Sequence, residues 1–555
     1  MNRIIRKISF GLTGIGIALL LGGIISSVFF SEKIENTVIA NLKDQAPSNL
    51  TIGSVEFQLF DDFPFSTVKI EALCLKEDSV FGNDTLIYAQ TAYVKFSLIK
   101  FMFKKFSIEN ISIYNGKISI KENLDKSNYA FLTQKNNAEN GIKLEKIELI
   151  NTLFNYSSEK NKTILSFISS KTTVKINEQN FYNISGDCIS KQTKVKNKEY
   201  LNNKRLKLNL NYTNIEKTAT LKSSFIGIED LKFFVKGFLN DEKYLDLEVI
   251  GEEQSIKSFA EHTPAHFKNV YSAILLDGNI DYKATIKGKM GSNTNPHLTI
   301  DYSISNGVFE TKKYPFYLSM ISCNGIIDNG INNNFKTSSI SFNNFNGKTR
   351  KGVINGVFSI SNLEEYYLNA NFNSTWEMNE ANYYFPESPF YECSGLINTK
   401  TKYAGRISFN ETFNNHFLKS NHHSEITLSK LEFLYSNYPI KINIEQATGE
   451  IYNDSISIEK SIINIKDSDI KYNGTVKNLF NYILLDNSSE IELVGDINSK
   501  TINLKNLIVS DTSKSANINE FTLPHFLNLR LNSSIETLVY NNIYPNKIEG
   551  DILYK

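Results

Sequence analysis

Proline, tryptophan and cysteine are scarce in this 555-residue chain, which has 10 Pro, 1 Trp and 4 Cys. The cysteines stand singly, with no CxxC pair, at Cys74, Cys188, Cys323 and Cys393. This spacing argues against a zinc site and against a small disulfide-dense domain. Free or buried thiols are favoured, and one long-range disulfide stays open as the alternative.

An excess of either charge is also missing, because 60 Lys and Arg face 59 Asp and Glu. A nucleic-acid binder would show a clear basic excess, so nucleic acid is excluded as the expected partner. Phenylalanine (38) and tyrosine (28) are abundant. Such a composition favours β-strands and argues against a disordered chain.

Catalytic motifs are absent too: the chain has no GxSxG, HExxH, P-loop or GxGxxG before a helix. The nearest approach to a metal site is His262 with His266, but Pro264 between them disturbs the helical turn that would bring them together. His422 and His423 are adjacent in a polar stretch and do not face one another. We therefore predict a protein that is not an enzyme, with no catalytic, metal-binding or cofactor-binding residue.

One long apolar run is present, at residues 8–30, and it contains no charged residue. Such a run is long enough to cross a hydrocarbon core of about 30 Å as a helix. Arg3, Arg6 and Lys7 precede it, so the positive-inside rule predicts a cytoplasmic tail at 1–7 and places the rest of the chain across the membrane. A cleaved signal peptide is the alternative. It is disfavoured because the run exceeds a typical h-region and no clear cleavage site follows.

After a short helix or linker at 31–47, apolar and polar residues alternate along most of the chain. Clear examples are LKLNLNY (206–212), IDYKATI (280–286) and LTIDYSI (298–304). Strands with one apolar and one polar face belong to an antiparallel sheet that is wet on one side. We expect a mainly β protein.

A repeat of about 120 residues is visible from residue 205 to 555. The glycine-bearing strands VKGFL, INGVF and YNGTV place Gly237, Gly356 and Gly474 at nearly constant spacing. A less alternating segment follows each copy, at 255–267, 377–386 and 500–508, where we expect short helices. We predict an N-terminal β region at 48–204, then these repeats, the last one incomplete.

The chain resembles the AsmA family in four features that occur in the same order. These are the apolar run behind a basic tail, the strand pair TIGSVEFQLFDDFPFSTVKIEALCLKED (51–78), the passage at 86–132, and the later repeat. Within the passage at 86–132, Asn128-Tyr129 occupies the position of the "G..N" motif that ends this region in the family, without its usual glycine. The Asn-, Lys- and Ile-rich style is similar to the Bacteroidetes branch.

This resemblance implies a long, twisted, taco-shaped antiparallel sheet with an apolar inner groove. It also implies a relationship to TamB and to the chorein-type bridge-like lipid-transfer proteins, and a role in outer-membrane biogenesis and homeostasis. The implied partners are the inner membrane, a phospholipid or other acyl-chain ligand, and an outer-membrane or periplasmic protein. No catalytic residues and no cofactor are attributed to the family.

Two functional hypotheses follow. The first is an inner-membrane-anchored periplasmic protein that carries phospholipid along its groove between the two membranes. The second is a non-transporting envelope scaffold, or an outer-membrane protein assembly factor, with a closed β core. For the first, the candidate groove-lining residues are Val55, Phe57, Leu59, Leu208, Leu210, Leu247, Tyr282, Ile300 and Phe372. Phe63 and Phe65 are candidates for the groove mouth, with a plain turn as the alternative interpretation.

Overall fold

A computed structural model of the chain confirms a mainly β protein, since most of the residues that it describes lie in strands and few lie in helices. The chain divides into two compact units. Unit 1 is Met1–Val249 with His262–Lys268, and unit 2 is Ile250–Glu261 with Asn269–Lys555. The residues that the structure describes are 35–36, 39–40, 49–58, 65–77, 79–97, 108–130, 144–177, 180–196, 198–262, 274–291, 294–312, 316–384, 390–407, 413–435, 438–482, 489–507, 526–540 and 543–554.

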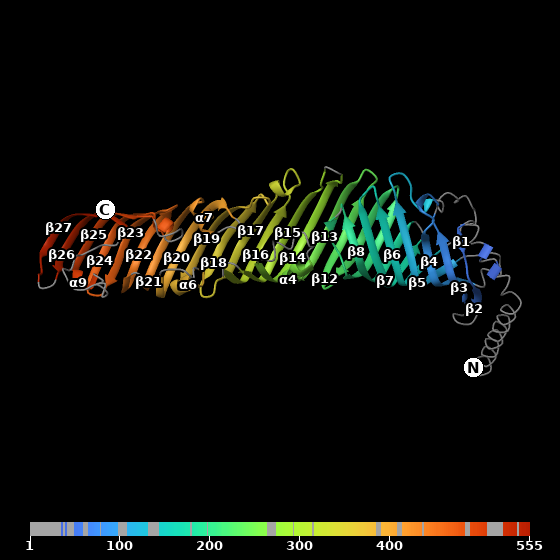
Figure 1. Cartoon of the computed structure of the whole chain (residues 1–555), viewed down its shortest axis with the longest axis horizontal. Coiled ribbons are helices and arrows are strands. Elements are labelled where there is room, and N and C mark those ends of the chain that lie inside the picture. The colour runs from blue at the N-terminus through green and yellow to red at the C-terminus, as the bar shows by residue number, and fades with distance from the viewer. Residues whose placement is uncertain are drawn as a thin grey trace, which may run out of the picture. The chain divides into compact units, whose positions relative to one another are not determined.

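Unit 1 is a sheet whose long strands follow one another in chain order (Figure 1). Its elements are β1 (Leu50–Thr51), β2 (Val55–Gln58), β3 (Phe65–Lys76), η1 (Ser79–Phe81), β4 (Thr85–Ser97), β5 (Ile108–Glu122), β6 (Lys146–Ser158), β7 (Thr163–Asn177), β8 (Phe181–Val195), β9 (Lys198–Glu199), β10 (Lys204–Ile215), β11 (Thr218–Ile228) and β12 (Leu231–Leu239). Strand β13 (Tyr244–Ser255) and helix α4 (Ile256–His262) carry the chain on into unit 2.

Unit 2 is built in the same way, with β14 to β27 laid side by side in chain order (Figure 1). Its strands are β14 (Ile274–Lys289), β15 (His297–Thr311), β16 (Tyr317–Asp328), β17 (Ser339–Lys348), β18 (Val353–Ser361), β19 (Tyr367–Glu377), β20 (Phe390–Arg406), β21 (Asn421–Tyr435), β22 (Tyr438–Tyr452), β23 (Ser455–Ile465), β24 (Ser468–Lys477), β25 (Ile491–Asn503), β26 (Leu527–Val539) and β27 (Asn546–Tyr554). Its helical segments are η3 (Phe335–Thr337), η4 (Met378–Glu380), α6 (Ala381–Tyr384), α7 (Phe413–Leu418), α8 (Leu479–Asn481) and α9 (Leu504–Leu507).

Among the strand pairings that the structure describes, most are antiparallel, as predicted, and two are parallel. Strands β5 and β6 run parallel, and so do β25 and β26. Parallel neighbours need a crossover connection, and both pairs are joined by long segments, 123–145 and 504–526. The expectation of a wholly antiparallel sheet is therefore corrected at these two places.

The three less alternating segments of the repeat contain short helices, as predicted. Helix α4 follows β13, η4 and α6 follow β19, and α9 follows β25. Of the helices with described bounds, α4 is the longest, with seven residues. Each helix is therefore too short to cover much of a sheet face.

The repeated glycines have the same structural role in each copy. A Cβ atom on Gly237 would collide with the backbone of Asp246 and Leu247 on the next strand, where φ of Gly237 is also +140°. At Gly356 the atom would meet the backbone of Asn371 and Phe372, and at Gly474 the backbone of the facing strand β25. The spacing therefore marks positions where two strands approach more closely than a side chain allows.

Replacing Gly356 by valine should destabilise unit 2 by about 1–3 kcal/mol, because the new side chain overlaps Phe372 Cα, 2.6 Å from the position of its Cβ. Gly550 on β27 is the matched control, since a Cβ there meets nothing within 4 Å. Thermal unfolding followed by circular dichroism should show a lowered midpoint for Gly356→Val and little change for Gly550→Val. Equal midpoints would contradict the proposed steric role.

The predicted anchor at 8–30 lies outside the described residues. Among the residues that are described, no helix has the length and apolar character needed to cross a membrane. Within the predicted linker, residues 35–36 and 39–40 are helical, and the backbone N–H of Phe57 donates to Glu35 Oε1 at 3.0 Å. This contact ties the segment to the first long hairpin of unit 1.

Candidate functional site

One face of unit 1 carries continuous rows of apolar side chains that run across the strands. Directly paired residues lie on the same face, so a row is traced through the pairing register. The first row is Phe57, Val68, Val94, Ile111, Ile147, Val174, Ile184 and Leu210. A second row beside it is Val55, Ile70, Ala92, Ile113, Leu149, Thr172, Gly186, Leu208, Ile226 and Phe233. These rows define the apolar face of unit 1.

Unit 2 has rows of the same kind. One is Ala284, Ile300, Ile327, Ile340, Ile360, Leu368 and Gly405. Another is Gly356, Phe372, Thr401, Ser424, Ile451, Ile456, Val476, Leu493, Leu529 and Tyr554. These rows define the apolar face of unit 2, and they require only that each strand keep its apolar positions in register with the next.

Burial along the apolar faces is uneven. At β3 and β4 the side chains of Val68, Ile70 and Phe96 have no exposed surface and form a packed core. Farther along, Leu208 and Ile456 are only half-buried. In unit 2, Val476, Leu529 and Leu531 also lie in a buried cluster. The apolar faces are therefore closed at β3 and β4 and at β24–β26, while other parts of the rows keep surface that a fully packed core would hide.

In unit 1 the structure brings four of the predicted groove residues together. Phe57 and Leu210 lie in one row, and Val55 and Leu208 lie in the other. Val55 and Phe57 pack against the closed core, and each is half-buried, so part of each side chain stays exposed. Leu247 lies beside Gly237, one strand farther on.

The remaining predicted residues divide into three groups. Tyr282, Ile300 and Phe372 all lie on the apolar face of unit 2, with Tyr282 paired to Tyr302. Phe65 lies on the opposite face of β3 from Val68, where Lys95 Nζ stands 5.0 Å from its ring centroid. Phe65 therefore does not share the face of the predicted groove. Leu59 and Phe63 lie outside the described residues.

Aromatic side chains are concentrated on the apolar face of unit 2 between β15 and β19. Phe358 and Phe372 are stacked, with centroids 5.6 Å apart, and Phe345 meets Phe358 edge-on at 4.9 Å. Phe309, Phe316 and Trp376 pack around the same buried centre. Large apolar rings with a half-buried surface suit contact with a hydrocarbon ligand.

Sequence reasoning missed a group of hydroxyl side chains within this apolar face. Thr401 and Ser424 are paired across β20 and β21, with Oγ1 and Oγ 2.9 Å apart, and Ser374 contacts Thr399 at 2.7 Å. Trp376 Nε1 donates to Ser374 Oγ. These hydroxyl groups hydrogen-bond with one another, so the presence of polar side chains in the apolar row costs little free energy. Alternating Thr and Ser at 399, 401 and 424 was a visible signal, but only the register shows that they meet.

Replacing Thr401 by valine should destabilise unit 2 by about 1–2 kcal/mol, because Ser424 is nearly buried and loses its partner. The double variant Thr401→Val/Ser424→Ala removes both hydroxyls and should be closer to the parent in stability. Urea unfolding of the single and double variants measures this. If the free energy of unfolding of the double variant fell by the sum of two large single losses, Thr401 and Ser424 would not be each other's hydrogen-bond partners.

The two adjacent histidines lie on opposite faces of β21. His422 is buried and stacks on Phe417, with ring centroids 4.2 Å apart, and burial lowers its pKa below the ordinary value. His423 lies on the polar face, with Nε2 3.2 Å from Glu450. His262 contacts Lys204 and Asp230. Across the described part of the chain, no group of three or more His, Cys, Asp or Glu residues could hold a metal ion.

All four cysteines are free thiols, and three of them are buried. Cys188 and Cys323 lie on the apolar faces, paired with Leu206 and Ile304, and burial raises the pKa of each to about 11. Such thiols are poor nucleophiles at neutral pH. They serve as small apolar side chains in the sheet.

The Asn128 that marks the end of the family-like passage has a defined structural role. It is fully buried, donates to Glu77 Oε2 at 2.8 Å and to Ser119 O at 2.9 Å, and accepts from Lys121 N. Lys121 Nζ lies 2.9 Å from Glu77 Oε1, and Glu77 is itself fully buried. This cluster fastens the end of β5 to the end of β3.

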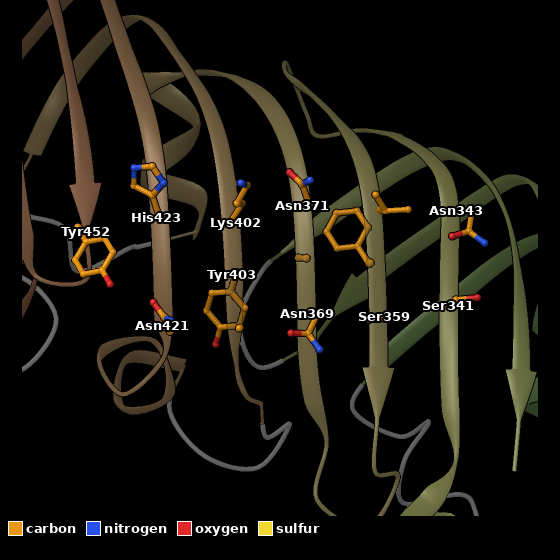
Figure 2. A pocket seen from close by; sticks show the side chains of 14 residues that line it. Ser341, Asn343, Ser359, Asn369, Asn371, Lys402, Tyr403, Asn421, His423 and Tyr452 are labelled. Atoms are coloured by element: carbon orange, nitrogen blue, oxygen red, sulfur yellow. The ribbon is translucent and has the colours of Figure 1, made fainter. Parts of the chain in front are cut away.

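The face opposite the apolar one is polar, and in unit 2 it is hollowed over β17 to β22. Figure 2 shows two rows of side chains there, carried by neighbouring strands. One row is Ser341, Ser359, Asn369, Ala404 and Asn421, and the other is Val357, Asn371, Lys402, His423 and Tyr452. Asn343, Phe358, Ala370 and Tyr403 complete the lining. We call this the polar hollow; its volume is about 640 Å³.

Comparison of the chain with models of known protein families, with curated proteins and with solved structures found no match.

Proposed function

We propose that this protein binds the acyl chains of phospholipids along the apolar faces of its two units and transfers them between envelope membranes, as AsmA-like proteins are expected to do. The observation that carries the proposal is the continuity of the apolar rows, which pass from strand to strand through the pairing register. A phospholipid needs no specific side chain to move along such a face.

Energetics favour this ligand. Exposing one CH₂ group of an acyl chain to water costs about 0.8 kcal/mol of free energy. Along a row of similar apolar side chains, each step replaces one set of contacts by an equivalent one, so movement costs little. Aromatic and aliphatic residues such as Phe372 and Ile451 supply these contacts, and both are half-buried.

The closed core at β3 and β4 refines the proposal. Val68 and Ile70 leave no surface for a ligand there, and Val476 and Leu529 are buried in a second core at β24–β26. We therefore place the acyl-chain path over β6–β12 in unit 1 and β14–β23 in unit 2. The segment predicted as a membrane anchor, 8–30, would then hold the closed end of unit 1 beside the inner membrane. A lipid would enter farther along the sheet than Phe63 and Phe65.

The same closed core is the observation that favours the second hypothesis, a non-transporting scaffold. If the other rows were covered in the cell by a protein partner, the sheet would serve assembly and not transfer. The two functions differ in whether lipid reaches the rows beyond β5.

Vesicle transfer of a fluorescent phospholipid tests the proposal. Donor vesicles of phosphatidylethanolamine and phosphatidylglycerol would contain the reconstituted full chain, and acceptor vesicles none. We expect transfer faster than between protein-free vesicles, and unchanged transfer for Thr401→Val/Ser424→Ala, which leaves the row apolar. Transfer no faster than without protein would contradict the proposal and favour the scaffold.

A further inference from the structure

Arg350, on the turn between β17 and β18, is an exposed arginine that is held in place by aromatic rings. Its guanidinium carbon lies 5.4 Å from the ring centroid of Tyr317 and 4.8 Å from that of Tyr383. Arg205 and Arg406 differ, because each forms an ion pair with a glutamate. Among the described residues, no carboxylate forms an ion pair with Arg350. The rings restrain the guanidinium and leave the N–H groups at its edge available to a ligand.

The turn that carries Arg350 is fixed by a buried carboxylate. The backbone N–H of Lys351 donates to Glu380 Oε1 at 2.6 Å, and Thr349 Oγ1 donates to the same oxygen at 3.0 Å. Glu380 has no exposed surface, and fully buried carboxylates are rare in proteins. The position of the turn is therefore set before a ligand arrives, so binding loses little conformational entropy here.

The charges around the turn favour an anionic ligand. Lys348, Arg350 and Lys351 carry positive charge, against Glu377 and Glu380. Lys351 Nζ lies 3.3 Å from Glu377 Oε2, so these two charges are matched, and Glu380 accepts hydrogen bonds from the turn itself. The guanidinium of Arg350 is left as a donor for an anion. Its planar pairs of N–H groups match two oxygens of a phosphate.

The turn lies at the end of the strands that carry the aromatic side chains of the apolar face. Phe316 directly precedes Tyr317, and Phe345 and Ile354 lie on the two strands that the turn joins. All but Tyr317 belong to the cluster around Phe358 and Trp376. An acyl chain that contacts this cluster would therefore bring the polar end of its lipid to the edge of the sheet, where Arg350 stands.

We propose that Arg350 binds the phosphate of a phospholipid whose acyl chains lie against this aromatic cluster. The inference rests on the proposed function and adds to it the place where the polar end of the lipid is held. The phosphate accepts hydrogen bonds from two N–H groups of the guanidinium at once. The rest of the headgroup stays in water at the edge of the sheet.

Isothermal titration calorimetry with the full chain in amphipol tests this, using three soluble probes: dihexanoylphosphatidylglycerol, dihexanoylglycerol and inorganic phosphate. The first two have the same acyl chains, and only the first has a phosphate. We expect Arg350→Gln to weaken binding of dihexanoylphosphatidylglycerol about tenfold or more, the size of a hydrogen-bonded charge pair. Binding of dihexanoylglycerol should not change. Arg350→Lys should cause a smaller loss, because it keeps the charge but not the planar pair of donors.

Arg530→Gln is the matched control, because it removes the same charge from an exposed arginine on β26. It should leave the binding of both lipids unchanged. Equal affinity of Arg350→Gln and the parent for dihexanoylphosphatidylglycerol would overturn this inference, while the acyl-chain function would stand. Loss of dihexanoylglycerol binding in Arg350→Gln would also overturn it, since Arg350 would then only support the fold.

The remaining outcomes separate the source of the phosphate from the function itself. Inorganic phosphate should displace dihexanoylphosphatidylglycerol only weakly, because it gains no contact with the apolar face. Displacement by inorganic phosphate at concentrations equal to those of the lipid would overturn the inference and indicate a site for a free anion. Failure of the parent to bind either lipid would contradict the proposed function.

Discussion

Replacing Phe372 by aspartate should reduce phospholipid transfer at least about tenfold while the protein stays folded. Phe372 lies in a continuous row on the apolar face of unit 2 and is half-buried against Phe358. A carboxylate there would have to lose its water whenever an acyl chain passed, and desolvation of a charge costs several kcal/mol. Vesicle transfer measures the effect, and circular dichroism checks the fold.

The matched control is Asn373→Asp, one residue away on the polar face of the same strand, which should transfer lipid normally. Phe372→Leu should also retain most transfer, since it keeps the row apolar. A folded Phe372→Asp protein with full transfer would show that acyl chains do not use this row. An unfolded Phe372→Asp protein beside a folded Asn373→Asp protein would indicate a closed core and favour the scaffold.

Replacing Lys121 by methionine should destabilise unit 1 by about 3 kcal/mol. Lys121 Nζ lies 2.9 Å from both Glu77 and Asp84, and Glu77 has no exposed surface. Removing the ammonium leaves the buried carboxylate with Asn128 alone, and breaking one side of such a pair is strongly destabilising. Urea unfolding at neutral pH measures the loss.

Lys117→Met is the control, because Lys117 is on the same strand and exposed. The double variant Glu77→Gln/Lys121→Met should recover much of the loss. Hydrogen bonds and attraction from Asp84 and Glu77 raise the pKa of Lys121 above 10.5. Its stabilising effect is therefore complete below pH 10.5 and declines as the pH rises through the raised pKa. A loss equal to that of Lys117→Met would contradict the role of the buried cluster.

Alternation within strands was readable from the sequence, and so were the faces of most candidate residues. Leu208 and Leu210 each stand between polar neighbours, as do Ile300 and Tyr302. This alternation is enough to assign each residue to one of the two faces of its strand. The repeated glycines were also visible, because close strand approach leaves the same residue in each copy.

The sequence did not predict which residues pair across neighbouring strands, or where a bulge shifts the apolar positions along a strand. A bulge between Leu221 and Ser224 in β11 inserts one residue and shifts the apolar positions from odd to even numbers. Nothing local in the sequence marks it, since Ser223 carries the positive φ without being a glycine. The parallel pairing of β5 with β6 was hidden for a related reason: it depends on a long connection and not on either strand.

Pairing partners far apart in the sequence explain the other differences. Asn128 was recognised only as a motif position, although its partner Glu77 lies 51 residues earlier. Thr401 and Ser424 lie 23 residues apart, and only the pairing register shows that they meet on the apolar face. Phe65 was grouped with Phe63 by proximity, while its place in β3 puts it on the polar face.

Site-specific photocrosslinking in cells tests the central claim most directly. A benzoyl-phenylalanine at Leu208 in unit 1 or at Ile300 in unit 2 would stand on an apolar face, and one at Lys283 would stand on the polar face, paired with Asp301. We predict light-dependent phospholipid adducts, identified by mass spectrometry, at Leu208 and Ile300 and none at Lys283. Adducts equal at all three positions, or absent from all three, would contradict an acyl-chain path along the apolar faces.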